Sequence, residues 1–150
     1  MTDRPNGFTL TELLIVIVIS LALTSIAVTA AQPAQNRYAV RGARDGFVAM
    51  HARARAQAVE AGKTTTLTLD FASDRATITR GYTTLETVEF GEGLNVDIQG
   101  GGTTMTICMN SRGFGETSCN SFSTGTDITF VQGSSTERVC VYPLGQVLVP

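Results

Sequence analysis

Residues 7–31 read G-F-T-L-T-E-L-L-I-V-I-V-I-S-L-A-L-T-S-I-A-V-T-A-A, and this stretch decides how the chain is organised. No charged side chain occurs from Leu13 to Asn36. A helix rises ~1.5 Å per residue, so roughly 20 apolar residues cross a hydrocarbon core of about 30 Å. The few hydroxyl side chains of the stretch are too weak to form a solvated face. The stretch is therefore predicted to be a membrane-spanning helix rather than the core helix of a soluble protein.

Glu12 is the one carboxylate beside this apolar run. An ionisable side chain at the edge of a membrane helix costs roughly 3 kcal/mol or more unless it is paired, and it is by default a candidate functional residue. Something is expected to neutralise it.

With the residues before it, Glu12 completes the string G-F-T-L-T-E-L-L-I-V. This string resembles the processing site of type IV pilins and type II secretion pseudopilins. The resemblance implies cleavage after Gly7 by a prepilin peptidase and N-methylation of the new amine of Phe8. It also implies that Glu12 pairs with the N-terminal amine of a neighbouring subunit, which satisfies both charges in a filament core.

The organisation implied by this resemblance has three parts. Residues 1–7 are a cleaved leader peptide, residues 8–36 a hydrophobic transmembrane and filament-core helix, and residues 37–150 an external pilin head. The head consists of an amphipathic helix over residues 37–62 and a β-sheet over residues 63–150.

A secretory signal peptide is the main alternative, because Val28-Thr29-Ala30 offers small residues for cleavage. Its flanks fit poorly, since Asp3 offsets Arg4 and Glu12 starts the apolar run. Arginines after the run outnumber Arg4, so the positive-inside rule places the C-terminal side in the cytoplasm. Long domains translocate largely regardless of charge, however. We therefore expect a single-pass protein of the bacterial inner membrane with a periplasmic C-terminal domain, incorporated into a pilus or pseudopilus.

The next segment predicts an amphipathic helix. Pro33 is expected to kink the helical pattern, because it removes a hydrogen bond and clashes with the preceding turn. Gly62 is a plausible C-terminal stop. Between them, small and apolar residues recur at a spacing of 3.6 and predict a face packed closely against a sheet: Val40, Ala43, Phe47, Met50, Ala54, Ala58 and Ala61.

A second stripe of the same helix is basic and consists of Arg37, Arg41, Arg44, His51 and Arg55. The favoured interpretation is a solvated face that also meets lipid headgroups near Arg37 or acids of a neighbouring subunit. A nucleic-acid track is the alternative, although no aromatic residue interleaves the stripe to stack bases. The lone His51 is expected at the surface. The net charge of −2 argues against a dedicated nucleic-acid binder.

After Gly62 the hydrophobic period changes to two. A hairpin is predicted over residues 66–80, with its turn at residues 72–74, followed by short strands at residues 87–90, 94–98, 105–109, 127–131 and 138–142. The expected fold class is α+β, with a long N-terminal helix packed on one antiparallel sheet. This order resembles the subfamily that contains type II secretion protein H and the minor pilin FimT.

Three cysteines fall in the last third of the chain without the spacing of a zinc site. In an oxidising compartment we expect a disulfide between Cys108 and Cys119, because glycines between them let the chain turn back. Cys140 is then a buried free thiol in an apolar strand. Three inert thiols in a cytosolic protein are the alternative.

These observations favour a minor pilin or pseudopilin that acts in filament initiation or tip assembly. Its expected partners are other pilin or pseudopilin subunits, a prepilin peptidase, the inner-membrane assembly platform and membrane lipid. A DNA-binding minor pilin is the alternative, and it is disfavoured because no arginine follows Arg138. No catalytic motif, metal cluster or cofactor site is recognised, so an enzyme is not expected.

Overall fold

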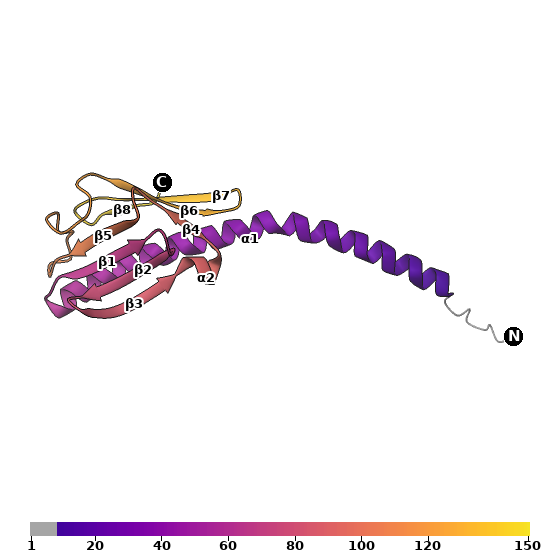
Figure 1. The fold of residues 1–150 in the computed structure, drawn as a ribbon, viewed down its shortest axis with the longest axis horizontal. Helices are drawn as coiled ribbons and strands as arrows, with labels where there is room; N and C mark the ends of the chain where they lie inside the picture. Colours follow the sequence, from indigo (N-terminus) through magenta and orange to yellow (C-terminus); the bar gives the residue numbers. More distant parts are fainter. Residues whose placement is uncertain (1–8) are drawn as a thin grey trace. The chain divides into compact units, whose positions relative to one another are not determined.

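The computed structural model describes residues 9–150 as one long helix followed by short strands and a five-residue helix (Figure 1). The predicted leader, with Gly7 and Phe8, lies outside the described residues. The chain divides into two compact units, a first that ends at Gln35 and a second from Asn36 to Pro150.

Helix α1 runs without interruption from Leu10 to Ala61 and passes through Pro33. The predicted kink at Pro33 concerns how the two units are set relative to each other, and it stays a prediction. The second half of α1 has the predicted buried face, whose fully buried members are Val40, Ala43, Phe47, Met50, Ala54 and Ala58. The 3.6-residue spacing of small and apolar residues thus identified the face of α1 that enters the core of the head.

The end of α1 is fixed by Gly62, which has a φ of +60°. The Gly62 N–H donates to the Val59 carbonyl and the Lys63 N–H donates to the Ala58 carbonyl, both at 3.2 Å. This pair of bonds satisfies carbonyls that the helix leaves open, and it requires a left-handed residue at Gly62.

The strands form two four-stranded antiparallel sheets. The first has the order β3-β2-β1-β5 and the second the order β4-β6-β7-β8. The strands are β1 (Thr65–Asp70), β2 (Arg75–Arg80), β3 (Thr83–Glu89), β4 (Asp97–Gln99), β5 (Thr104–Met109), β6 (Thr126–Gln132), β7 (Ser135–Val141) and β8 (Val147–Leu148).

The prediction of a single sheet is therefore wrong, although the fold class of a long helix on antiparallel β-structure is confirmed. The reason lies at the outer edge of β5. The loop after β5 turns back and occupies that edge, where the Glu116 N–H donates to the Cys108 carbonyl and the Ser121 N–H to the Thr106 carbonyl. Strand β6 cannot pair there, so the first sheet ends and a second begins.

Two predicted strands also need correction. Residues 87–90 are the end of β3 plus the first residue of a short helix, α2 (Phe90–Leu94). Of the predicted strand 94–98, only residues 97 and 98 are extended, as part of β4. Helix α2 starts where the Phe90 N–H donates to the Asp74 carbonyl at 2.8 Å, and it ends at Asn95 with a φ of +54°. Strand β8 was not predicted.

One hydrophobic core joins the second half of α1 to both sheets. Phe130 of β6 lies between Phe47 of α1 and Phe90 of α2, with ring centroids 6.0 and 6.1 Å away. The Asp74 carboxylate accepts the Ile98 N–H at 2.7 Å, so the turn after β1 in the first sheet also holds β4 of the second. Residues 36–150 thus form a head with its own core.

Candidate functional site

The first half of α1 exposes its apolar side chains. The run from Leu13 to Ile19 is 51–58% exposed, and Leu10, Leu21 and Leu23 are more exposed still. An 18-residue window of α1 has a mean hydropathy of 2.7, and the helix is long and apolar enough to cross a membrane. Apolar surface of this extent is stable only when lipid or other apolar helices cover it.

Glu12 forms a reciprocal cap with Thr9 at the start of α1. Its carboxylate accepts the Thr9 N–H at 2.9 Å and the Thr9 hydroxyl at 3.0 Å, while the Thr9 hydroxyl accepts the Glu12 N–H at 3.3 Å. This is a capping box, in which both ends of a T-x-x-E sequence satisfy open helix donors. Within residues 9–150 no cation pairs with Glu12. The hydrogen bonds with Thr9 order the first turn of α1.

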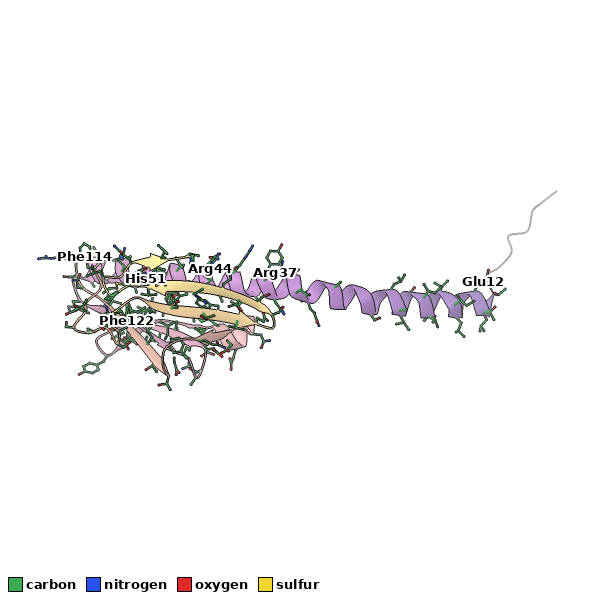
Figure 2. All side chains as sticks on the ribbon, turned by 90° about the horizontal axis from the view of Figure 1, so that it is seen from above. Glu12, Arg37, Arg44, His51, Phe114 and Phe122 are labelled. Carbon is green, nitrogen blue, oxygen red and sulfur yellow. A yellow bond between two sulfur atoms is a disulfide. The ribbon has the colours of Figure 1, made fainter. Side chains whose placement is uncertain are left out.

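The basic stripe of the second half of α1, of which Figure 2 labels Arg37, Arg44 and His51, does not form one exposed surface, because Arg44 is half-buried and His51 is buried. Glu137 of β7 accepts from Arg41 at 3.2 Å and from Arg44 at 2.8 Å. Arg44 also pairs with Asp45 at 2.9 Å, and hydrogen bonding to Asp45 helps to raise the pKa of its guanidinium. These ion pairs tie α1 to the second sheet, so both arginines serve the head itself.

The lower part of the stripe lies beside the chain between β7 and β8, where Arg55 is exposed and His51 is buried. Arg55 donates from Nη2 to the Gly145 carbonyl. His51 is only 5% exposed, so the prediction that it lies at the surface is wrong. Burial, followed by the charge of Arg55, lowers the pKa of His51 to about 4, so its imidazole is neutral at pH 7. Arg37 is exposed and has no ion pair within residues 9–150.

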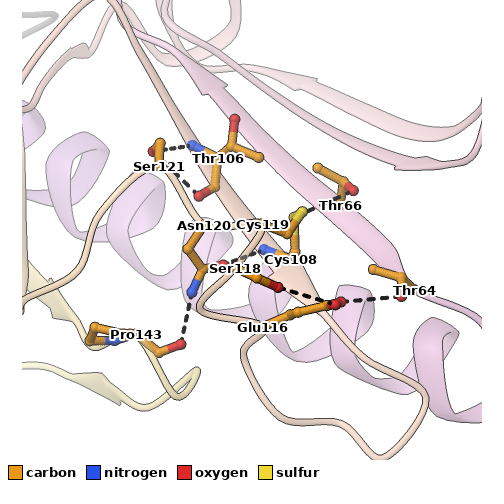
Figure 3. Close-up of a disulfide and its surroundings, with 10 residues drawn as sticks. All are labelled: Thr64, Thr66, Thr106, Cys108, Glu116, Ser118, Cys119, Asn120, Ser121 and Pro143. Atoms are coloured by element: carbon orange, nitrogen blue, oxygen red, sulfur yellow. Dashed lines mark hydrogen bonds between the residues drawn. A yellow bond between two sulfur atoms is a disulfide. The ribbon is translucent and has the colours of Figure 1, made fainter.

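Cys108 and Cys119 form a disulfide with a Cα–Cα distance of 5.8 Å, which is the pairing expected from the sequence (Figure 3). Cys140 has a free thiol but is half-buried rather than fully buried. It lies in β7 opposite Asp127 and Leu148, and so it shares the outer side of the sheet with two exposed residues.

Asn120 connects the disulfide loop to the C-terminal turn (Figure 3). Its side-chain oxygen accepts the Cys108 N–H at 2.7 Å, and its side-chain nitrogen donates to the Pro143 carbonyl at 2.8 Å. The Gly115 N–H donates to the Leu144 carbonyl at 2.9 Å, and a Cβ at Gly115 would clash with the backbone of that turn. The turn at residues 143–146 is thus held in place over α1.

Sequence reasoning missed several of these residues for different reasons. The T-x-x-E spacing was a readable signal for the Thr9–Glu12 cap. No local pattern identifies Glu137 or Asn120, because each acts on a segment far along the chain. Within residues 9–150, no group of three or more His, Cys, Asp or Glu side chains could hold a metal ion.

Comparison with known proteins gives one match to the N-terminal sequence and one match to the fold. Residues 3–30 match the family described as the prokaryotic N-terminal methylation motif. In structure, the chain is similar to the type IV minor pilin FimU of Pseudomonas aeruginosa strain PAO1, with a TM-score of 0.54 and 12% sequence identity over 80% of this chain and 91% of that chain. No curated protein matches the sequence. The chain is therefore pilin-like, with an N-terminal methylation motif on the helix of a pilin fold.

Proposed function

We propose that this protein is a minor pilin or pseudopilin, a structural subunit that acts in filament initiation or at the filament tip. The observation that carries the proposal is the exposed apolar first half of α1, which needs lipid before assembly and neighbouring helices after it. The leader resembles that of type IV pilins and of type II secretion pseudopilins alike, so the protein would support pilus biogenesis or protein secretion. A structural role needs no catalytic residues.

Maturation follows from the motif. A prepilin peptidase would cut after Gly7, and the amine of Phe8 would then be methylated. Before assembly the protein would sit in the bacterial inner membrane with residues 37–150 in the periplasm, where an oxidising environment would support the disulfide of the head. The inner-membrane assembly platform would then move it into the filament.

Intact mass spectrometry of the protein purified from its native membrane tests this maturation. The expected mass is that of residues 8–150 with one methyl group and one disulfide. A mature chain that starts at Ala31, or a chain that keeps Met1, would contradict the proposal. Gly7→Ala should still be processed, whereas a bulky residue at Gly7 should block the peptidase.

Glu12 is proposed to guide assembly through its charge, by pairing with the Phe8 amine of a neighbouring subunit. Its cap with Thr9 offers a second explanation for why the residue matters, and two variants separate them. Glu12→Gln keeps a side chain that can cap at this position but has no charge, whereas Glu12→Ala loses both. Both variants should be processed and inserted in the membrane, because neither step needs the charge of residue 12. Both should enter filaments poorly, because pairing with the Phe8 amine does need it.

Filament incorporation is measured by the fraction of each variant that co-purifies with sheared filaments. If Glu12→Gln enters filaments as the wild type does while Glu12→Ala does not, the cap rather than the charge explains the role of Glu12. Thr9→Ala is the matched control, because it disturbs the cap and leaves the carboxylate.

DNA binding in natural transformation has less support. Arg41 and Arg44 are engaged with Glu137, and Arg55 is engaged with the Gly145 carbonyl. Arg37 alone of the candidate arginines lacks such a partner within residues 9–150, and a headgroup contact beside the apolar segment suits it well. Gel shifts at about 0.15 M salt should therefore show weak or no binding of duplex DNA, and micromolar binding lost in an Arg41/Arg44 double alanine variant would reverse this ranking.

A further inference from the structure

We propose that the open edge of β8, together with the adjoining flank of α1, binds one extended segment of another pilin-type subunit as a fifth strand of the second sheet. The identity of the partner rests on the proposed function. The site itself rests on the head of residues 36–150, and four observations support it.

The first observation is a groove of about 810 Å³ between α1 and the β7–β8 connection. Its helix side includes Val48, Ala52, Ala56 and Val59, and its other side runs from Gly145 to Val147. Along α1 it extends for roughly 16 Å, which is the length of about five extended residues. A strand, rather than a helix or a compact ligand, fits this long and shallow shape.

The second observation is the direction of the β8 backbone. The Tyr142 N–H donates to the Gln146 carbonyl at 2.9 Å, and β7 pairs Val141 with Val147 and Cys140 with Leu148. Hydrogen-bonded and non-hydrogen-bonded pairs alternate in an antiparallel ladder, so the N–H and C=O of Val147 point away from β7. β8 is the last strand of its sheet, and these groups therefore face the open edge where another strand can pair.

The third observation is which face an added strand would bury. Val147 packs against the core, whereas Leu148 is 55% exposed. A residue beside Val147 on an added strand would therefore point toward α1, where the small side chains of Ala52 and Ala56 are exposed and leave room. The expected partner is an extended segment with an apolar residue at every second position.

The fourth observation is His51. It lies in the lining of the groove, and its buried Nε2 atom has no hydrogen-bond partner within residues 9–150. A buried polar atom without a partner costs roughly 1–3 kcal/mol. A neutral imidazole nitrogen can donate or accept one hydrogen bond, so a peptide group of the added strand that reaches Nε2 would satisfy it. Arg55 of α1 donates to the Gly145 carbonyl on the opposite side, which fixes the distance between the two sides of the groove at that point.

Amide hydrogen exchange on the full-length protein tests the proposal. The exchange rate of the Val147 amide is compared between the protein in detergent micelles and the protein in filaments sheared from cells that make it with its neighbouring subunits. We expect exchange at least about tenfold slower in filaments, because the Val147 N–H then donates to the added strand.

Two alanine variants give the matched control. Ala52→Leu fills the groove, whereas Ala49→Leu adds the same side chain to an exposed site of α1 outside the groove lining. Filaments with Ala49→Leu should keep the protection of Val147. With Ala52→Leu the protection should disappear, or the variant should fail to enter filaments, and either result supports the site.

Three outcomes would overturn the proposal. Fast exchange of the Val147 amide in wild-type filaments would show that no added strand pairs with β8, and it would leave the proposed filament role untouched. If the Val147 amide stays protected in filaments of Ala52→Leu, some contact other than the groove protects it. A wild-type chain that never enters filaments would contradict both this proposal and the proposed function.

Discussion

The two halves of α1 have the same backbone conformation but opposite environments. From residue 10 to residue 35 the apolar side chains run without a polar stripe, and those described are exposed. From residue 36 to residue 61 the apolar residues recur every three or four positions and lie against two sheets. The second half is stabilised by the rest of the head, whereas the exposed apolar side chains of the first half need lipid or neighbouring helices around them.

The two halves should differ most in how much the free energy of unfolding of the head falls when one large side chain is truncated. Phe47→Ala removes a fully buried ring that contacts Phe130, and it should lower the free energy of unfolding of the head by about 3–5 kcal/mol. Ile17→Ala, in the exposed half, should change it by less than about 0.5 kcal/mol. Urea unfolding of the full-length protein in detergent micelles, followed by tyrosine fluorescence, measures both. A large loss with Ile17→Ala would mean that the first half also supports the head.

A smaller effect should follow from the titration of His51. Its pKa is about 4 in the folded head and near 6.5 in the unfolded chain, so the unfolded state binds a proton first as the pH falls. Stability should therefore be full above about pH 6.5 and fall by roughly 2 kcal/mol between pH 7 and pH 5. Residues 36–150 can be unfolded with urea across this range. His51→Gln should flatten this part of the curve, and an unchanged slope would mean that His51 stays solvated.

The smallest effects should come from two glycines of the second half that differ in conformation. Gly62→Ala forces a side chain into a φ of +60° and should destabilise the head by about 1 kcal/mol. Gly42 lies within the helix, and an added Cβ there meets nothing within 4 Å. Gly42→Ala should therefore stabilise the head by about 0.5–1 kcal/mol. Thermal unfolding of residues 36–150 should show opposite shifts, and shifts of the same sign would contradict the proposed end of α1.

The helix was readable from the sequence because its signals are local. The uncharged run, the 3.6-residue spacing and the stop at Gly62 each depend on neighbours a few positions away. The hairpin of β1 and β2 was readable for the same reason, since its alternation and its turn at residues 72–74 are contiguous. The T-x-x-E cap belongs to the same class of local signal.

The partition of the strands into two sheets was not readable, because alternation shows that a strand exists but not which edge it pairs with. Helix α2 contains two glycines, which disfavour helix, and it forms because Asp74 accepts the Phe90 N–H from a distant turn. His51 lies on the polar stripe of α1 by periodicity, yet it is buried, with its ring 6.4 Å from that of Phe47. Residues Gly145–Val147 line the same groove of the head, and no local pattern brings them near His51.

That one helix belongs to both units has a mechanical consequence. A subunit in the proposed filament is loaded in tension when the filament is pulled, and the load on the first half of α1 reaches the head through the backbone of that helix. Six fully buried residues of α1 from Val40 to Ala58 pack against the rest of the head, and Arg41 and Arg44 form ion pairs with Glu137. These contacts are spread over about five turns of α1, so pulling the helix out of the head requires the core of the head to open. Resistance to a pull should therefore follow the unfolding rate of the head rather than its equilibrium stability.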